Sequence, residues 1–436
     1  MEIKAFKAFR FDSAVVGNAS DCICPPYDVI DPKMQDDLYN KGEFNAVRIV
    51  KGKSEGSDTD TDNKYTRAGA SLAEWIEKGA VKQDDKDAIY AYIQDFDIGT
   101  THCTRSGFVA LGKLQPFGDG VQPHEKTLDG PKADRLKLMR EKKAQFGQIF
   151  MLFDDPKKIA DEIIEKVATR DCLIDFTDDD GVKHRIYAID DPADVDAVTS
   201  MMASKEAVIA DGHHRYETAL NYFAETKNPA AEYRMMTFVN MHNEGLVVLP
   251  THRLVAGLSD FDIVSVIEKI GDGFEVAEYS FANDAVKDSA KKQMFNQMRS
   301  DFEQDKNSVG IYAADGKFYV AVLKDVESMN KIGPDMSDAA KGLDVNVLHM
   351  LILDKVMGIG DKELAGQSNI KYIKDIGNAI DQSIAKVDSG QSQVVFFINP
   401  TRVDQVRDIA AANEKMPQKS TFFYPKIYTG LVINKL

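Results

Sequence analysis

The sequence predicts an α+β protein with more than one domain, and three observations lead to this prediction. Short apolar runs of strand length recur along the chain, for example Gln148–Phe153 and Val394–Ile398. Between them lie stretches such as Tyr65–Lys78, whose apolar residues recur at helical spacing. The chain has 436 residues, whereas a single hydrophobic core stops growing at roughly 250–300 residues. We therefore expect two or three domains.

The first predicted domain covers residues 1–155. Consecutive prolines keep Cys24–Ile30 extended, because proline lacks an amide donor and restricts the residue before it. Apolar patterning predicts strands over Phe44–Val50, Ala88–Phe96, Arg105–Leu114 and Gln148–Phe153, and helices over Tyr65–Lys78 and Lys132–Phe146.

The second predicted domain covers residues 156–257 and the third covers 258–436. In the second, the pattern predicts helices over Lys157–Thr169, Pro192–Ser204 and Arg215–Thr226, and strands over Arg185–Ile189, Ala207–Ala210, Met235–Met241 and Leu246–Leu249. In the third, a first helix is followed by strands over Val309–Tyr312, Phe318–Leu323 and Val394–Ile398, and by helices over Val345–Met357 and Val403–Asn413. The first two domains form the predicted catalytic region.

The charge and the cysteine content narrow the partners and the compartment. With 54 Lys and Arg against 70 Asp and Glu, the formal charge is −16, which repels polyanions and argues against nucleic acid as a partner. A small phosphorylated ligand remains compatible, because a few cations can govern one pocket. The longest apolar runs are too short to span a bilayer, so no membrane partner is expected. Four cysteines in so long a chain fit a reducing cytoplasm.

The sharpest local signal is the stretch from Ala207 to Leu220, AVIADGHHRYETAL. A buried strand stops at Asp211-Gly212, and a helix begins with His213, His214 and Arg215. Cations at a helix N-terminus are unfavourable unless an anion is bound there as well. The turn therefore predicts a phosphate site. Two alternatives stay open: Asp211 merely caps the helix while the histidines pack, or the two histidines bind a metal.

Three further loops carry cations at the ends of predicted strands. They are His124-Glu125-Lys126-Thr127, Thr251-His252-Arg253 and Lys419-Ser420-Thr421. A histidine, a carboxylate and an ammonium in a row can supply a general base and phosphate contacts. The alternative is a solvated charged loop or a surface strand. Neither GxGxxG nor HExxH occurs, and Leu114 stands where a phosphate-binding loop needs Ser or Thr.

Several segments together resemble one family, the domain of unknown function 1015 family of bacteria and archaea. The segments are CPPYDVI (24–30), NAVRI (45–49), HEKT (124–127), IADGHHRYETAL (209–220), GLVVLPTHR (245–253) and MPQKSTFFYPKIYTGLV (416–432). They span essentially the whole chain in one order. The family name carries no activity.

The DGHHR turn by itself is similar to that of the ParB-like fold, which includes nucleotide-binding partition proteins and free-serine kinases. This resemblance implies a ParB and serine-kinase-like mixed α/β catalytic region, with the third domain as an additional C-terminal α+β region. It also implies that Asp211, His213, His214 and Arg215 hold phosphates. The acidic composition departs from partition proteins that bind DNA.

Together, these observations and resemblances predict a small-molecule kinase that phosphorylates a hydroxyl. The favoured acceptor is free L-serine, which would become O-phosphoserine, and the donor is ATP, ADP or pyrophosphate. Glu125 is the first choice for the carboxylate that takes the hydroxyl proton, Asp28 is the second, and Asp211 is the expected Mg²⁺ ligand. Additional phosphate contacts are expected from His124, Lys126, His252, Arg253 and Lys419. The alternatives are a phosphatase acting on phosphoserine or a similar monoester, and a non-catalytic nucleotide-binding switch.

Overall fold

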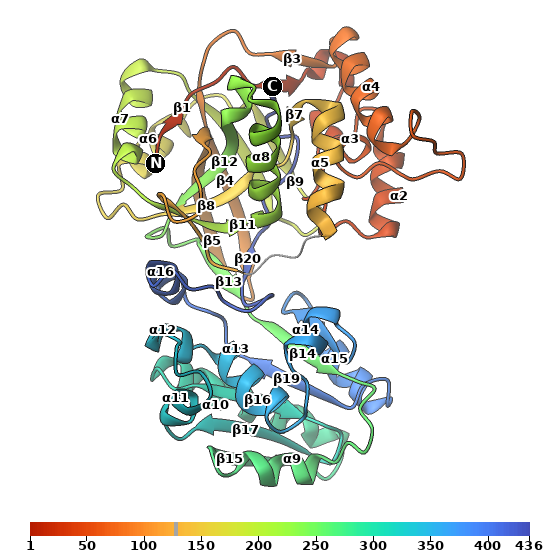
Figure 1. Ribbon diagram of the computed structural model, residues 1–436, viewed down its shortest axis with the longest axis vertical. Coiled ribbons are helices and arrows are strands. Elements are labelled where there is room, and N and C mark those ends of the chain that lie inside the picture. Colours follow the sequence, from red (N-terminus) through yellow and green to blue (C-terminus); the bar gives the residue numbers. More distant parts are fainter. Residues whose placement is uncertain (126–129) are drawn as a thin grey trace. The chain divides into compact units, whose positions relative to one another are not determined.

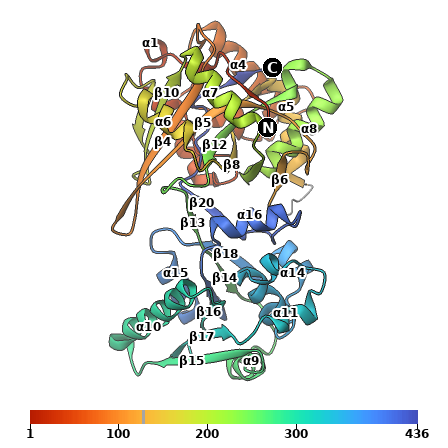
Figure 2. The same ribbon diagram turned by 90° about the vertical axis from the view of Figure 1, so that its left-hand side faces the viewer.

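The computed structural model describes residues 1–125 and 130–436, and their contacts group them into two compact units (Figures 1 and 2). Unit 1 consists of Met1–Pro123, Thr127–Val247 and Pro425–Leu436. Unit 2 consists of His124–Lys126 and Val248–Tyr424. The grouping is by contact and not by chain order, since the end of the chain returns to unit 1. The division into 1–155, 156–257 and 258–436 stays a prediction.

A mixed nine-stranded sheet forms the centre of unit 1. Its order is β6-β11-β8-β12-β5-β4-β10-β9, and β1 pairs with β5. The strands are β1 (Ile3–Lys4), β4 (Ile89–Ile98), β5 (Thr101–Lys113), β6 (Val121–Pro123), β8 (Ile149–Phe153), β9 (Ile174–Thr177), β10 (Lys183–Ile189), β11 (Ala207–Asp211) and β12 (Tyr233–Asn240). Strand β11 runs parallel to β6 and antiparallel to β8. The sheet therefore places the end of β11 near the edge, where the next helix begins.

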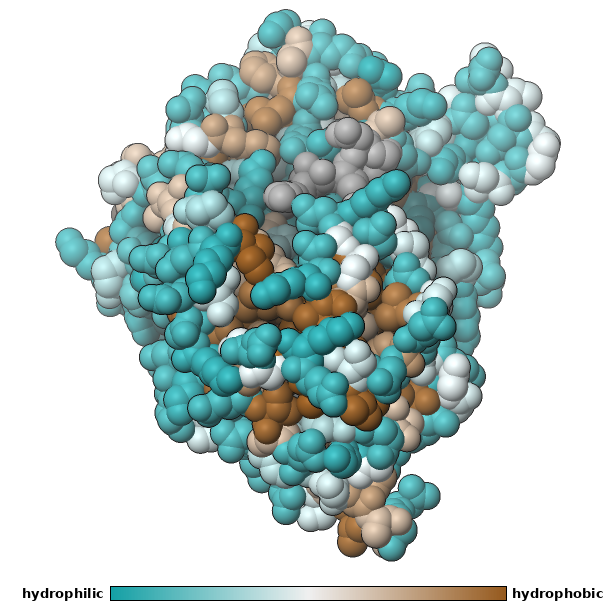
Figure 3. All heavy atoms as spheres, turned by 60° about the horizontal axis from the view of Figure 1, so that its bottom comes forward, coloured by the Kyte–Doolittle hydropathy of each residue, from teal (hydrophilic) through white to brown (hydrophobic). Residues whose placement is uncertain are grey.

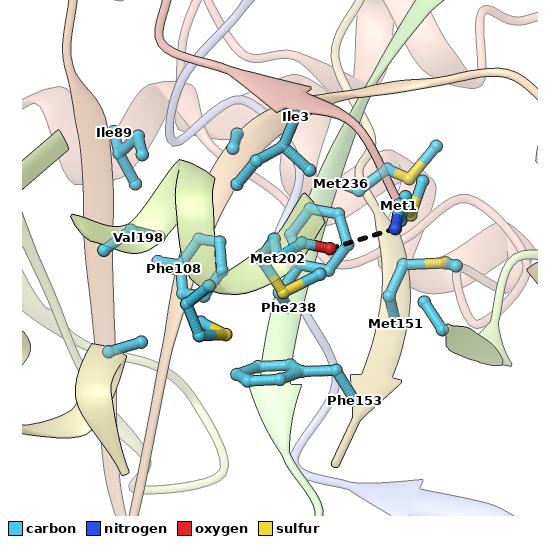
Figure 4. Packing of buried hydrophobic residues seen from close by; sticks show 14 of the residues in the cluster. Met1, Ile3, Ile89, Phe108, Met151, Phe153, Val198, Met202, Met236 and Phe238 are labelled. Carbon is cyan, nitrogen blue, oxygen red and sulfur yellow. Dashed lines mark hydrogen bonds between the residues drawn. The ribbon is translucent and has the colours of Figure 1, made fainter. Parts of the chain in front are cut away.

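The core of unit 1 lies between this sheet and the helices that pack on it. Phe108, Phe153 and Phe238 come from three strands and pack ring against ring within it (Figure 4). Helices α6 (Ile159–Val167) and α7 (Pro192–Ala203) add aliphatic and methionine side chains. The amino group of Met1 donates to the carbonyl of Met202 at 2.9 Å, which fixes the start of the chain on this core (Figure 4).

Four other helices of unit 1 follow one another in a row that starts at α8 (His213–Thr226). Helix α8 packs on α5 (Gly130–Lys142), α5 on α4 (Lys64–Glu77), and α4 on α3 (Val47–Val50) (Figure 1). The other elements of unit 1 are α1 (Ser13–Val16), η1 (Ala19–Cys22), α2 (Pro32–Lys41), η2 (Pro229–Glu232), and the short strands β2 (Phe9–Phe11), β3 (Val81–Gln83), β7 (Ala144–Gln145) and β21 (Asn434–Lys435). The row places α5 beside the helix that begins with the two histidines.

Unit 2 is built on an antiparallel six-stranded sheet with the order β15-β17-β16-β19-β14-β18. The strands are β14 (Thr251–Val255), β15 (Phe274–Ser280), β16 (Ser308–Tyr312), β17 (Lys317–Leu323), β18 (Ile370–Lys374) and β19 (Val394–Ile398), and β13 (Val247–Leu249) pairs with β20 (Phe422–Tyr424). The helices are α9 (Ile263–Ile270), α10 (Asp284–Glu303), α11 (Glu327–Ile332), α12 (Asp338–Lys341), α13 (Asp344–Val347), the π-helix Leu348–Asp354, α14 (Asp361–Gly366), α15 (Ala379–Asp388) and α16 (Val403–Ala411). Met294 and Met298 of α10 pack against Val320 and Phe397 in its core.

The structure confirms the predicted mixture of helices and sheets and corrects several elements. Thr251-His252-Arg253, predicted as a loop, begins strand β14, and the helix predicted over Val345–Met357 is the short helix α13 followed by the π-helix Leu348–Asp354. The pattern predicts a strand over Phe44–Val50, but Val47–Val50 is helical. The side chain of Asn45 accepts from the amide of Val47 at 2.9 Å and donates to the carbonyl of Ile23 at 3.2 Å, and this local bonding starts a turn in an apolar run that periodicity alone does not resolve. The helix predicted to Phe146 ends at Lys142, because Lys143 adopts φ 45° and β7 follows.

None of the described helices is long and apolar enough to cross a membrane. Figure 3 shows a face on which hydrophilic side chains predominate and hydrophobic ones are interspersed. Single exposed apolar residues of unit 2 include Val264, Val286 and Ile376, and scattered residues of this kind are normal on protein surfaces.

The central strand β5 gives a prediction about packing. A Cβ atom at Gly107 would lie 2.5 Å from the carbonyl oxygen of Phe238 on β12, so Gly107→Ala must push two paired strands apart. We expect a loss of roughly 1–3 kcal/mol in the free energy of unfolding, measured by chemical denaturation. Gly56→Ala is the control, because a Cβ atom there meets no atom within 4 Å. Equal stabilities of the two variants would contradict the described register.

Candidate functional site

The turn between β11 and α8 is built around Gly212. This residue has φ 100°, a backbone conformation that side chains with a Cβ rarely adopt. A Cβ atom there would also lie 3.0 Å from Nε of Arg215. Glycine thus lets the strand pass into the helix within one residue and lets the guanidinium of Arg215 lie against the turn. The first amides of α8 point out of this end of the helix, as at every helix N-terminus.

The carboxylate of Asp211 lies between two cations. Its Oδ2 accepts from Nζ of Lys426 at 2.8 Å, and its Oδ1 lies 3.4 Å from Nη2 of Arg215. Burial alone would raise the pKa of Asp211, but Lys426 and then Arg215 outweigh it and hold this pKa well below its ordinary value. Asp211 is therefore an ionised, immobilised group that positions Arg215 at the turn.

The three residues after the glycine take different positions. His213 opens α8 and is 7% exposed, whereas His214 and Arg215 are half-buried. Nη1 of Arg215 donates to the carbonyl of Gln148, the residue before β8. The carbonyl of His214 accepts from Thr218 Oγ1 at 2.6 Å. Arg215 is thus anchored to both Asp211 and the neighbouring strand, and its guanidinium remains beside the helix N-terminus.

Asp28 and Tyr27 belong to the same region of unit 1. Burial raises the pKa of the Tyr27 hydroxyl, and the charges of Arg215, Asp28, Arg135 and Asp211 act on it. Asp28 itself is exposed. The structure therefore brings three of the predicted residues (Asp28, Asp211 and Arg215) close enough to Tyr27 for their charges to act on it. His213 acts on Asp211, and His214 follows it in α8.

A pocket of about 580 Å³ opens beside Tyr27 and Asp28. Four cations line it (Lys51, Lys53, Lys64 and Arg135), as do the carboxylates of Asp28, Asp36 and Asp134. Burial alone would raise the pKa of Asp134, but Arg135, Tyr65 and Lys64 lower it to about 2. Burial and the nearby Arg135 lower the pKa of Lys51, which Asp28 partly offsets. The pocket therefore combines fixed ion pairs with an exposed carboxylate.

The guanidinium of Arg135 connects the pocket to the chain around it. It stacks 4.1 Å from the centre of the Tyr27 ring and donates to the carbonyl of Val50 at 2.6 Å. Its Nε donates to Asp134 at 2.8 Å. Lys51 Nζ donates to the carbonyl of Tyr27 at 3.0 Å. These bonds order the proline-rich loop that carries Asp28.

The other predicted site residues that the structure describes lie in unit 2. His124 is fully buried, and its Nε2 lies 2.8 Å from Oγ1 of Thr421. Oε1 of Glu125 accepts from the backbone amide of Lys419 at 2.5 Å. These contacts connect the HEKT segment to the MPQKST segment. Lys126 and Thr127 lie outside the described residues.

His252 and Arg253 are buried inside unit 2. Nε of Arg253 donates to His349 Nε2 at 3.1 Å, and Nη2 donates to the carbonyl of Lys419 at 3.2 Å. Burial lowers the pKa of Arg253 to about 10. Nδ1 of His252 accepts from the amide of Ile398 at 3.3 Å. Each of these contacts serves the packing of unit 2, and the roles of His252 and Arg253 as phosphate ligands stay predictions.

The Mg²⁺ prediction depends on the ligands that the site offers. Among residues 1–125 and 130–436, no three His, Cys, Asp or Glu side chains cluster as metal ligands do. Both oxygens of Asp211 face cations. Mg²⁺ usually takes one or two carboxylates and completes its shell with substrate phosphates and water. An ion at this site would thus depend on the donor's phosphates, and the role of Asp211 as its ligand stays a prediction.

Sequence reasoning missed the groups that tie the site together. Lys426 lies in a motif, but its pairing with Asp211 leaves no local signal, since the two residues are 215 positions apart. Arg135, Lys142 and Arg234 carry no motif signal. A cation in a helix or strand whose pattern is otherwise ordinary looks like a solvated surface residue, and only the fold reveals its burial.

The chain belongs to the family described as "Protein of unknown function (DUF1015)", which matches residues 3–346. No curated protein matches it in sequence.

Several solved structures are similar to the chain at low identity. A conserved hypothetical protein from Pyrococcus furiosus is 15% identical, covers 73% of this chain and 92% of its own, and gives a TM-score of 0.32. A free serine kinase in complex with AMP is 14% identical, with coverages of 74% and 92% and a TM-score of 0.34. SbnI with a C-terminal truncation, from Staphylococcus aureus, is 8% identical, with coverages of 75% and 87% and a TM-score of 0.33.

The pair of Asp211 and Lys426 gives a prediction about pH dependence. Lys426→Met leaves a half-buried carboxylate without its closest cation, and we expect a loss of roughly 1–3 kcal/mol in the free energy of unfolding at pH 7. In the wild type, the low pKa of Asp211 adds stability that is complete above its ordinary value of 3.8 and is lost as pH falls toward the lower, folded-state pKa. In the variant this pKa rises, so protonation relieves the unpaired charge at a higher pH.

Thermal unfolding between pH 7 and pH 4 checks this prediction. The difference in Tm between the wild type and Lys426→Met should narrow as the pH falls. Lys435→Met is the control, because Lys435 lies in the same C-terminal segment and is exposed. A difference in Tm that stays constant across this range would mean that Lys426 acts through packing alone.

Proposed function

We propose that this chain of the DUF1015 family transfers a phosphoryl group to the hydroxyl of a small molecule. The observation that carries the proposal is the joint position of the DGHHR turn and the pocket around Asp28. A helix N-terminus and the anchored Arg215 supply positive charge on one side, where His213 begins the helix. An exposed carboxylate and several lysines lie on the other. Phosphoryl transfer needs such positioning and charge neutralisation more than covalent chemistry by the protein.

The bond changes follow from these positions. The acceptor oxygen attacks the terminal phosphorus, a new P–O bond forms, and the bond to the donor's bridging oxygen breaks. The hydroxyl proton passes to a carboxylate and then to solvent. Asp28 is the candidate in unit 1, and Glu125 is the candidate in unit 2. Mg²⁺ bound with the donor would neutralise charge on its phosphates.

The favoured acceptor is free L-serine, with O-phosphoserine as the product, as the resemblance of the DGHHR turn implies. The pocket beside Tyr27, about 580 Å³, has room for an amino acid together with part of a phosphate donor. Its mixed charges suit a zwitterion, because Asp28 can face an ammonium while Lys51 and Arg135 face a carboxylate. ATP, ADP and pyrophosphate are the donors to compare.

Phosphorus NMR tests the activity directly. Purified protein is mixed with Mg²⁺, L-serine and each donor in turn, and we expect O-phosphoserine with at least one donor. Its absence with every donor overturns the serine-kinase proposal. Phosphate release from phosphoserine alone would indicate a phosphatase instead. Donor binding without any product would indicate a nucleotide-binding switch.

The turn is tested by His213→Ala and His214→Ala. Each variant loses one group that contacts phosphate, and a hydrogen bond to a charged group is worth roughly 1.5–3 kcal/mol. We therefore expect donor affinity to fall by about 10-fold to 100-fold, as measured by calorimetry, with little change in Tm. His102→Ala is the control, because His102 is exposed on β5. Reduced Tm with full donor affinity would mean that the histidines only pack the turn.

The proton acceptor is assigned by comparing Asp28→Asn with Glu125→Gln. The variant that loses its carboxylate base should keep donor affinity and lose kcat by roughly 100-fold or more. Asp87→Asn, an exposed aspartate on unit 1, is the control. If both variants turn over at the wild-type rate, neither carboxylate takes the proton.

A further inference from the structure

A second and smaller cavity of about 40 Å³ lies in unit 1 between α5, α8 and the beginning of β12. It shares Tyr27, Val50, Arg135 and Leu138 with the larger pocket, so the two spaces are neighbours. Four cations line it, namely Arg135, Lys142, Arg215 and Arg234, and its lining includes no aspartate or glutamate.

Arg234 is buried without enough hydrogen-bond acceptors. Its residue is 3% exposed, and its Nη2 donates to the carbonyl of Gly147. Its Nε and Nη1 are buried and have no hydrogen-bond partner among the described residues. Buried guanidinium donors are normally satisfied, because each unpaired donor costs stability. Nε and Nη1 of Arg234 are therefore two N–H donors that could bind two oxygens of one oxyanion.

Lys142 is the last residue of α5 and is half-buried. Among the described residues, its ammonium has no hydrogen bond or ion pair, and its contact is with the ring of Phe146, 5.5 Å from the ring centre. Burial, and then the charges of Arg234 and Arg135, lower its pKa well below the ordinary value. The protein therefore places an ammonium where other cations disfavour its charge.

The four cations of the cavity differ in whether they have an ion-pair partner. Arg135 is paired with Asp134, and Arg215 is paired with Asp211. Arg234 and Lys142 have no such partner among the described residues. Burial, and then Arg215, lower the pKa of Arg234 to about 9. Two neighbouring cations without a counter-ion repel each other, and natural sequences keep such unfavourable arrangements chiefly at functional sites.

We propose that this cavity is a subsite for the terminal oxyanion of a small ligand, a carboxylate or a phosphate, held by Arg234 and Lys142. The guanidinium offers Nε and Nη1 on one side chain, and a guanidinium binds two oxygens of one oxyanion through two such donors. One water molecule needs roughly 10–15 Å³ of cavity volume. The cavity has about 40 Å³, which is enough for a carboxylate group, and a phosphate group would fill it. A longer ligand would extend into the larger pocket.

The proposed subsite adds a binding position to the proposed function. It rests on that function in one respect: whether the acceptor or the phosphate donor places its oxyanion in the cavity. If the acceptor's carboxylate occupies the cavity, the acceptor class is a hydroxy acid or hydroxy amino acid whose hydroxyl points toward the larger pocket. If a phosphate occupies it, the cavity holds the end of the donor. Both cases use the same oxyanion chemistry, and binding experiments separate them.

Calorimetry on the purified full chain tests the proposal with three probes: inorganic phosphate, L-serine and L-serinamide. The variants are Lys142→Met and Arg234→Met, which keep side-chain bulk and remove the charge. We expect either variant to weaken binding of the oxyanion probe at least 10-fold. L-serinamide, which lacks the carboxylate, should bind the wild type at least 10-fold more weakly than L-serine if the carboxylate occupies the cavity. Weaker phosphate binding in the variants with unchanged L-serine binding assigns the cavity to the donor.

Lys227→Met is the matched control. Lys227 caps the end of α8 and lies over a phenylalanine ring, 5.9 Å from the centre of Phe223, but it is exposed. Without any anion, Lys142→Met should be at least as stable as the wild type, since it removes repulsion. This readout keeps the proposal testable if Arg234→Met fails to fold.

The subsite and the proposed function fail in different ways. Wild-type affinity of Lys142→Met for phosphate and for L-serine overturns the subsite, and so does the absence of any binding of these probes to the wild type. Binding that depends on Lys142 in a protein without phosphoryl transfer activity keeps the subsite and overturns the kinase. If the protein forms O-phosphoserine but Lys142→Met and Arg234→Met bind phosphate and L-serine as the wild type does, the kinase proposal stands and the subsite proposal is overturned.

Discussion

The ion pairs of Asp211 hold the site of unit 1 together. This carboxylate contacts Lys426 near the end of the chain and Arg215 one turn into α8. The carboxylate is half-buried, and both cations lower its pKa and so stabilise its charge. Their presence fixes the orientation of Arg215 and the return of the C-terminal segment to this unit. The geometry of the strand–helix turn depends on these ion pairs. So does the position of Arg215 in the lining of the neighbouring cavity.

The electrostatics of the chain differ strongly between the whole molecule and this site. The formal charge is −16, yet the cavity beside Arg215 is lined by four cations without a lining carboxylate. A negative exterior discourages polyanions, whereas a cationic interior attracts one small anion. If the proposed subsite binds an oxyanion, this contrast would select by size as well as by charge, because a cavity of about 40 Å³ is too small for a polymer.

The sequence was a good guide where structure depends on neighbours along the chain. The alternation of apolar and polar residues predicted strands over Ala88–Phe96 and Arg105–Leu114. The first begins one residue before β4, and the second ends one residue after β5. The apolar pattern failed at Val47–Val50, where the side chain of Asn45 starts a helical turn in an apolar run. It also extended α5 past Lys142, because a positive φ at Lys143 leaves no trace in the hydrophobic pattern. Hydrophobic periodicity cannot predict the end of a helix or strand that is set by one side chain or one dihedral angle.

The sequence by itself determined the turn at Asp211–Arg215. A buried strand, a glycine and a cationic helix start lie within a few residues, and each is a local property of the chain. Only the tertiary structure decided which cations meet there. Lys426 pairs with Asp211 across 215 positions, and Arg234 and Lys142 are brought to one cavity by β12 and α5. The physical reason is that burial and missing counter-ions are properties of the space around a side chain, which forms only when distant segments pack together.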